Sequence, residues 1–178
     1  EAEIIYENHV AELLDKNKTY LYIDVGGGST ELTFFNKSKV EMQHSYNIGT
    51  VRMLTKKIKK KSWDELEQDL AELSKKFKNI VAIGSGGNIN KAISLLKKED
   101  SLQKGELKSF LNKLNQLSID QRMQLYNLKR DRADVLAPAL TIYDHIMECS
   151  HIQQIMVPKI GLVDGLMNHL YQIILKEK

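Results

Sequence analysis

The sequence predicts an α/β fold: a mixed sheet of five strands, the first three antiparallel and the later ones parallel, flanked by helices. Short apolar runs rich in β-branched and aromatic residues recur along the chain, as is typical of strands. Two of these runs end in glycine clusters, at residues 26–28 and 84–87, and helical periodicity follows the second cluster. Since parallel strands need a crossover connection, strands that alternate with helices extend a sheet in parallel.

The first half of the chain predicts a helix and then an antiparallel meander. The helix is expected at residues 1–14, and the three strands at residues 20–25, 31–35 and 40–48. The glycine turn joins the first two strands, and a polar loop joins the next pair. Ser62 and Glu65 have the spacing of a capping box, which predicts a helix that begins there and runs to about Lys78.

The second half predicts a strand, a glycine loop and a series of helices. The strand at residues 80–83 ends in the second glycine cluster. Apolar spacing predicts helices around residues 89–96, 107–117, 118–121, 131–149 and 162–174, with a last strand at residues 154–157. Ser118 caps the third of these helices, and Pro138 either kinks the fourth or starts its second part. This order of elements matches one half of the actin-like, ribonuclease-H-like phosphotransferase architecture.

Composition narrows the class of protein. The 178 residues are 42% apolar, enough for one compact core, so residues 1–178 are expected to form a single domain. A net charge of +3 is too small to require nucleic acid, but it is compatible with an anionic substrate. The single cysteine, Cys149, excludes an internal disulfide, and we expect a buried, reduced thiol in a cytoplasmic protein. No apolar run is long enough to span a membrane.

The first glycine cluster has the composition of a phosphate-handling loop. This segment reads Asp24, Val25, Gly26, Gly27, Gly28, Ser29, Thr30 and Glu31. Glycines that adopt positive φ can bring several amide N–H donors close to an anion. Asp24 and Glu31 place negative charge beside that anion, and a Mg²⁺ ion between acid and phosphate would resolve the conflict. The alternative is an ordinary hairpin turn.

The second glycine cluster is Gly84, Ser85, Gly86 and Gly87. It either eases a strand-to-helix turn or forms an anion site, because glycine amides at a helix N-terminus bind anions. We favour the anion site, with the Ser85 hydroxyl as a further donor.

Two other groups of residues leave their roles open. A basic run comprises Lys56, Lys57, Lys59, Lys60 and Lys61. It is either a solvated surface or a patch that attracts a polyanion such as polyphosphate. The five histidines, His9, His44, His145, His151 and His169, show no metal-ligand spacing, so surface or core roles are expected for them.

With both loops placed, the sequence closely resembles the Ppx/GppA family of exopolyphosphatases and guanosine pentaphosphate phosphohydrolases, within the actin-like superfamily. The matching segments are residues 1–3, 24–31, 49–52, 84–87, 132–134 with Pro138, and 161–166. They resemble, in order, the family's Glu-Ala stretch, its Asp-x-Gly-Gly-Gly-Ser-Thr-Glu loop, a Gly-x-Val-Arg turn, the second glycine loop, an Arg-Ala-Asp segment and a Gly-Leu-Arg-Glu-Gly-Leu ending. Val163 and Asp164 stand where that ending has Arg and Glu.

The resemblance implies roles for individual residues. Glu1 matches the catalytic glutamate that orients or deprotonates the attacking water. Asp24 and Glu31 would hold Mg²⁺ directly or through water, and residues 26–30 and 84–87 would bind phosphate. Arg132 matches the Arg-Ala-Asp segment, or it serves structurally by pairing with Asp131 or Asp134.

The implied function is release of terminal phosphate from inorganic polyphosphate or guanosine pentaphosphate with Mg²⁺. The matched region is the second domain of the family core, so a preceding domain of similar topology is expected before Glu1, and a homodimer is suggested. One alternative is an actin-like ATP-using kinase or ATPase with an adenosine pocket near residues 84–87. The other is a non-catalytic module that binds polyphosphate or an alarmone.

Overall fold

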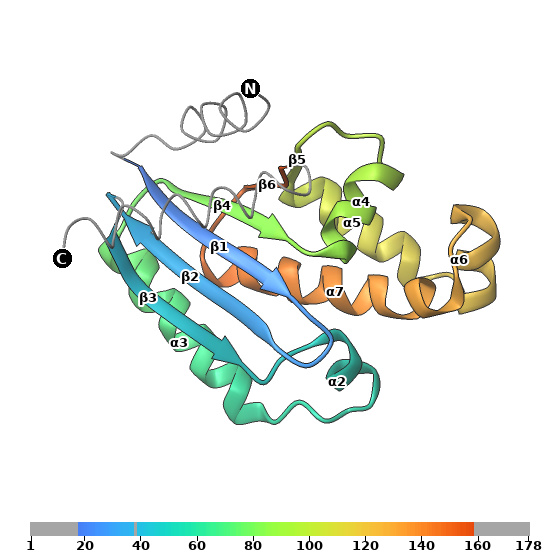
Figure 1. The fold of residues 1–178 in the computed structure, drawn as a ribbon, viewed down its shortest axis with the longest axis horizontal. Helices are drawn as coiled ribbons and strands as arrows, with labels where there is room; N and C mark the ends of the chain where they lie inside the picture. Colours follow the sequence, from blue (N-terminus) through green and yellow to red (C-terminus); the bar gives the residue numbers. More distant parts are fainter. Residues whose placement is uncertain (1–17, 38, 159–178) are drawn as a thin grey trace, which may run out of the picture.

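The computed structural model describes residues 18–37 and 39–158, which form a sheet covered by helices (Figure 1). Its elements are β1 (Thr19–Val25), β2 (Thr30–Asn36), β3 (Lys39–Tyr46), α2 (Thr50–Leu54), α3 (Lys60–Lys76), β4 (Ile80–Ser85), α4 (Gly87–Leu95), β5 (Ser101–Gln103), α5 (Lys104–Asn115), α6 (Ile119–Tyr126), α7 (Arg130–Cys149) and β6 (Gln154–Met156). The helices predicted at residues 1–14 and 162–174 lie outside the described residues.

The sheet is mixed, as predicted, with the strand order β3-β2-β1-β4-β6-β5. The antiparallel meander consists of β1, β2 and β3. β4 pairs in parallel with β1, and β6 pairs in parallel with β4, with helices in the connections. The sheet has six strands rather than the predicted five, because β5 pairs antiparallel with β6 at the edge. A strand of three residues is too short to show a period in the sequence.

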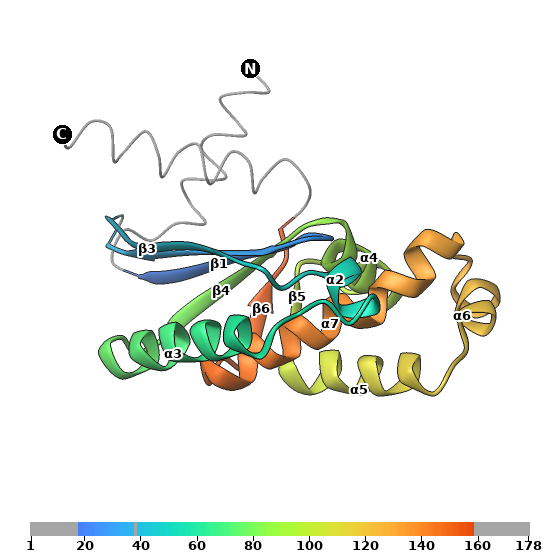
Figure 2. The same cartoon turned by 90° about the horizontal axis from the view of Figure 1, so that it is seen from below.

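Three of the helices, α3, α5 and α7, lie on one face of the sheet (Figure 2). β1 turns Leu21, Ile23 and Val25 into the core, and each is at most 3% exposed. These positions alternate along the strand, as expected when one face packs on a helical layer. α7 supplies the largest share of buried residues from that layer, so β1 and α7 form the centre of the fold.

Several helix boundaries differ from the prediction. α3 begins at Lys60, and its N-cap is Lys59 without a side-chain cap, so Ser62 lies inside the helix and forms no capping box. α6 has the predicted box, because Ser118 Oγ accepts a hydrogen bond from the Gln121 amide. α7 continues through Pro138 as one helix.

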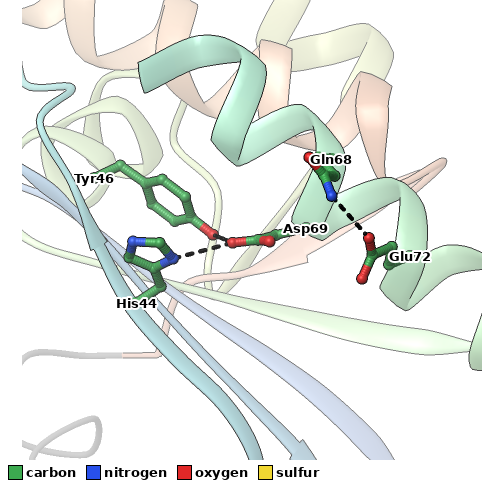
Figure 3. A network of polar contacts seen from close by, with 5 residues as sticks. All are labelled: His44, Tyr46, Gln68, Asp69 and Glu72. Carbon is green, nitrogen blue, oxygen red and sulfur yellow. Dashed lines mark hydrogen bonds and ion pairs between the residues drawn. The ribbon is translucent and has the colours of Figure 1, made fainter. Parts of the chain in front are cut away.

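A polar network ties the edge strand β3 to α3 (Figure 3). The Tyr46 hydroxyl donates to Asp69 Oδ2 at 2.5 Å, and His44 Nδ1 lies 3.1 Å from the same oxygen. The His44 and Tyr46 rings stack, with centroids 4.3 Å apart. Burial, followed by the neighbouring Asp69 carboxylate, raises the pKa of Tyr46 far above its usual value. Tyr46 therefore stays a neutral donor in the folded protein.

Candidate phosphate-binding site

The two predicted glycine loops lie next to each other at the carboxyl ends of the neighbouring strands β1 and β4, and this end of the sheet is called the loop edge below. β1 and β4 run in parallel, so their carboxyl ends lie side by side, with Asp24 of β1 in register with Ser85 of β4. Ligand sites in open α/β sheets lie at this kind of edge, where the strands end and the loops begin. The tertiary structure thus brings together two segments that are about 60 residues apart in the sequence.

The first glycine turn rests on the short helix α2. The amides of Thr50 and Val51 donate to the carbonyl oxygens of Gly26 and Gly27 at 3.0 and 2.9 Å. Arg52 Nε donates to the Gly28 carbonyl at 2.6 Å. With the carbonyls held from this side, the amides of Gly27 and Gly28 have no backbone acceptor within the part of the chain that the structure describes. The turn is exposed and offers these N–H donors to an anion.

Close contact with the start of α2, rather than positive φ, explains Gly27 of this turn and Gly49 beside it. Among the described glycines only Gly86 has positive φ, at 100°, so the prediction of left-handed backbone in the first turn was wrong. A Cβ atom on Gly49 would lie 2.6 Å from the carbonyl carbon of Gly27. A Cβ atom on Gly27 would lie 3.3 Å from a methyl group of Val51. The turn therefore packs on α2 more closely than side chains would allow.

Asp24 and Glu31 lie directly opposite each other on the antiparallel pair β1 and β2. Directly opposed residues project from the same face of a sheet with Cβ atoms about 5 Å apart. Glu31 is exposed, whereas Asp24 is half-buried with its carboxylate beside Gly86. Paired carboxylate oxygens are the ligands that hard cations prefer, so this donor set fits the predicted Mg²⁺.

The predicted phosphate ligands differ in how their side chains are used. Thr30 is fully buried, and its hydroxyl donates to the Ile48 carbonyl at 2.7 Å, so this hydroxyl is committed within the fold. Gly84 is buried inside β4, where a Cβ atom would lie 2.9 Å from Ile155. Among the predicted phosphate ligands, the exposed groups are therefore the backbone of residues 26–28 and Gly87 at the start of α4.

A guanidinium group lies over the N-terminus of α4. A Cβ atom on Gly87, the first residue of α4, would lie 2.9 Å from Arg132 Nη1. Arg132 forms no ion pair with Asp131, Asp134 or any other described residue, so the alternative of a structural ion pair was wrong. A helix N-terminus carries partial positive charge, so a cation beside it is unfavourable unless an anion lies between them. This arrangement is suited to binding an anion.

Tyr143 of α7 contacts the ends of the two strands that carry the glycine loops, a role that nothing in the sequence indicated. Its hydroxyl lies 2.5 Å from the Ser85 carbonyl and 3.3 Å from the Ile23 carbonyl, and it thus joins the ends of β4 and β1. Burial, followed by the negative charge of Asp24, raises its pKa well above the usual value. The hydroxyl stays protonated and fixes the spacing of the two strands that carry the loops.

The remaining predicted residues lie elsewhere or outside the description. Glu1 lies outside the described residues. The basic run is exposed along the connection from α2 to α3 and the first turn of α3, directly after the helix that supports the first glycine turn. In the sequence, Gly49 and Arg52 were only part of the segment 49–52 that resembles the family; the structure places both against the first glycine turn.

The sequence model of the Ppx/GppA phosphatase family matches residues 1–174. The chain belongs to the Ppx/GppA phosphatase family. Solved members of the family share its fold. A Ppx/GppA phosphatase of Aquifex aeolicus is 22% identical with a TM-score of 0.69, and the match covers 91% of this chain and 60% of that one. An exopolyphosphatase of Cytophaga hutchinsonii is 19% identical with a TM-score of 0.68, over 97% of this chain and 63% of that one.

Part of a much longer curated protein is similar to this chain. It is a bifunctional 3-dehydroquinate synthase/phosphatase of Fusobacterium nucleatum, 28% identical over 141 residues. The match covers 70% of this Ppx/GppA chain but only 21% of that protein. The chain thus spans about a fifth of this relative and about 60% of the solved family members. None of the described helices has the length and apolar character needed to cross a membrane.

Proposed function

We propose that this chain is the phosphate-binding part of a phosphohydrolase that releases terminal phosphate from inorganic polyphosphate or guanosine pentaphosphate, with Mg²⁺ as cofactor. One observation carries the proposal. Two opposed carboxylates, Asp24 at the end of β1 and Glu31 at the start of β2, flank an exposed triple-glycine turn, and Asp24 lies beside Ser85 of the strand that leads into α4. Membership of the Ppx/GppA phosphatase family supports phosphoanhydride hydrolysis as the reaction.

The residues at the loop edge match what phosphoryl transfer requires. Its transition state is loose and highly charged, so catalysis rests on alignment and on donors directed at the phosphoryl oxygens. The amides of Gly27 and Gly28 and the first amides of α4 are such donors. Arg132 adds a full positive charge beside them. Because these donors are held by α2 and by Tyr143, they need little rearrangement when the substrate binds.

Asp24 and Glu31 are the residues that would hold the metal ion. A Mg²⁺ ion at this position supplies charge neutralisation for the phosphate oxygens. Asp24 is the better fixed of the two carboxylates, because it is half-buried against Gly86. Glu1 keeps its predicted role in orienting the attacking water.

The basic run favours a long polyanion as substrate. Lys56, Lys57 and Lys59 follow α2, so an extended phosphate chain that leaves the glycine turn can pass along them. Exposed lysines attract such a chain by long-range electrostatics, an effect that weakens as salt is added. Guanosine pentaphosphate is shorter and gains less from this run.

The test measures binding and turnover separately. Binding of tripolyphosphate to this chain is measured by calorimetry with and without Mg²⁺, for wild type, Asp24→Asn and the control Asp64→Asn, whose carboxylate is exposed on α3. We expect Mg²⁺-dependent binding that falls roughly tenfold or more in Asp24→Asn and is unchanged in Asp64→Asn. Equal binding in all three proteins contradicts the site.

Turnover is followed as phosphate release from polyphosphate and from guanosine pentaphosphate, by this chain alone and fused to the first domain of a family relative. Release that depends on both Mg²⁺ and Asp24 supports the enzyme. Binding without release in the fused protein instead favours the non-catalytic module.

A further inference from the structure

A second cluster of potential metal ligands lies in the helical layer. Glu67 belongs to α3, and His145 and Cys149 belong to α7. His145 Nε2 lies 2.9 Å from Glu67 Oε1 and 3.7 Å from Cys149 Sγ, and all three ligand atoms lie within 4.8 Å of one another. It is the one group of three such ligands in the described part of the chain. The histidine spacing in the sequence had indicated no metal ligands.

The fold places these side chains together for simple reasons. Residues four apart share a face of a helix, so His145 and Cys149 project from α7 on the same side. α3 packs against α7, and Glu67 of α3 thereby reaches His145. Trp63, one turn before Glu67 on α3, packs edge-to-face with the His145 imidazole at a centroid distance of 4.7 Å. The imidazole is thus held in place from one side.

We propose that Glu67, His145 and Cys149 bind a divalent transition-metal ion of the zinc class. Zinc accepts carboxylate, imidazole and thiolate ligands at about 2.0 to 2.3 Å in a tetrahedral arrangement. These bond lengths place neighbouring ligand atoms roughly 3.3 to 3.6 Å apart. The two distances from His145 Nε2 fall on either side of that range and the remaining pair lies within 4.8 Å, so side-chain adjustments must draw Glu67 and Cys149 together to admit the ion. Binding releases the thiol proton of Cys149 to water and uses the lone pair of His145 Nε2, so the neutral imidazole carries its proton on Nδ1; the bound ion links α3 to α7.

The surroundings suit a cation and leave one coordination position open. The carboxylate of Glu67 places a negative charge beside the imidazole and the thiol, and a bound cation would neutralise it. The side chain of Glu67 is 47% exposed and that of His145 is 35% exposed, so water can fill the fourth position. Nitrogen and sulfur ligands disfavour Mg²⁺, which separates this site from the phosphate site.

The composition of the chain makes the test specific. Cys149 is the only cysteine and Trp63 the only tryptophan. A Co²⁺ ion in the site should therefore give a thiolate-to-cobalt charge-transfer band that only Cys149 can produce. The same ion should quench the fluorescence of Trp63, because its indole ring lies against the imidazole ligand. We expect both signals to saturate at one ion per chain, to reverse when Zn²⁺ is added, and to be absent with Mg²⁺.

Variants of the full chain assign the ligands. We expect Cys149→Ser to abolish the charge-transfer band, and His145→Gln and Glu67→Gln each to weaken Co²⁺ affinity roughly tenfold or more. The matched control His151→Asn alters an exposed histidine outside the cluster and should bind as wild type. Far-ultraviolet circular dichroism checks that each variant folds, and Glu67→Gln changes an exposed side chain that the fold tolerates. A missing thiolate band in wild type, or unchanged affinity in a folded Cys149→Ser, overturns the site.

Discussion

Gly49→Ala tests whether the first glycine turn depends on close backbone packing. Gly49 has φ −155° and ψ 162°, an extended conformation that alanine also adopts, so the cost comes from contact alone. The added Cβ atom would lie 2.6 Å from the carbonyl carbons of Gly27 and Gly28, whereas carbon atoms in contact need about 3.5 Å or more. The turn and α2 must therefore separate by about 1 Å.

That separation breaks the hydrogen bonds between the two segments. The amides of Thr50 and Val51 now reach Gly26 and Gly27 at 3.0 and 2.9 Å, and a shift of about 1 Å exceeds hydrogen-bonding range. Two lost hydrogen bonds cost about 1 kcal/mol each, and overpacking adds about 1 to 3 kcal/mol, so we expect a loss of about 3 to 5 kcal/mol in the free energy of unfolding.

Gly28→Ala is the matched control, because a Cβ atom there meets nothing within 4 Å. Both substitutions restrict the unfolded chain equally, so that effect cancels in the comparison. Urea unfolding followed by circular dichroism gives the two midpoints, with the slope as a check on the two-state assumption. The packing argument is refuted if Gly49→Ala unfolds within about 0.5 kcal/mol of wild type, or if Gly28→Ala is equally destabilising.

Three further substitutions have distinct expected outcomes. Ser118→Ala should lower the free energy of unfolding by about 1 kcal/mol because it removes a helix cap. Ser62→Ala should change that free energy by less than about 0.5 kcal/mol, because Ser62 caps no helix. Equal effects of the two substitutions in urea unfolding would contradict the caps seen in the structure. Below pH ~10 Tyr46 is protonated in both the folded and the unfolded protein, and its contribution to stability is complete. Above that pH only the unfolded protein ionises Tyr46, so the free energy of unfolding falls by up to about 1.4 kcal/mol per pH unit. Tyr46→Phe should lessen that slope in alkaline unfolding curves, and an unchanged slope would refute the raised pKa. Gly87→Ala should keep the thermal stability of wild type, because only the flexible end of the Arg132 side chain must move. It should nevertheless weaken tripolyphosphate binding in calorimetry. Unchanged binding would argue against an anion at this position.

Much of the fold followed from patterns local to the chain. The spacing of apolar residues predicted β1, β4 and α7, and the capping-box spacing of Ser118 and Gln121 predicted the start of α6. Both signals depend only on residues a few positions apart in the sequence. The same reasoning failed at Ser62, whose capping-box spacing lies one turn inside a helix that begins without a side-chain cap. It also missed β5, whose three residues pair only because β6 is adjacent.

The sequence by itself determined the glycine turn with its two flanking acids, since a hairpin of that length puts Asp24 opposite Glu31. Only the tertiary structure decided which distant groups surround it. Tyr143 reaches the end of β1 from 120 residues away, and the Arg132 side chain reaches Gly87 across the fold. Short-range hydrogen bonds and apolar spacing involve residues that are close in the sequence, so the sequence alone predicts them. The contacts of Tyr143 and Arg132 form only when whole helices and strands pack to bury their apolar faces.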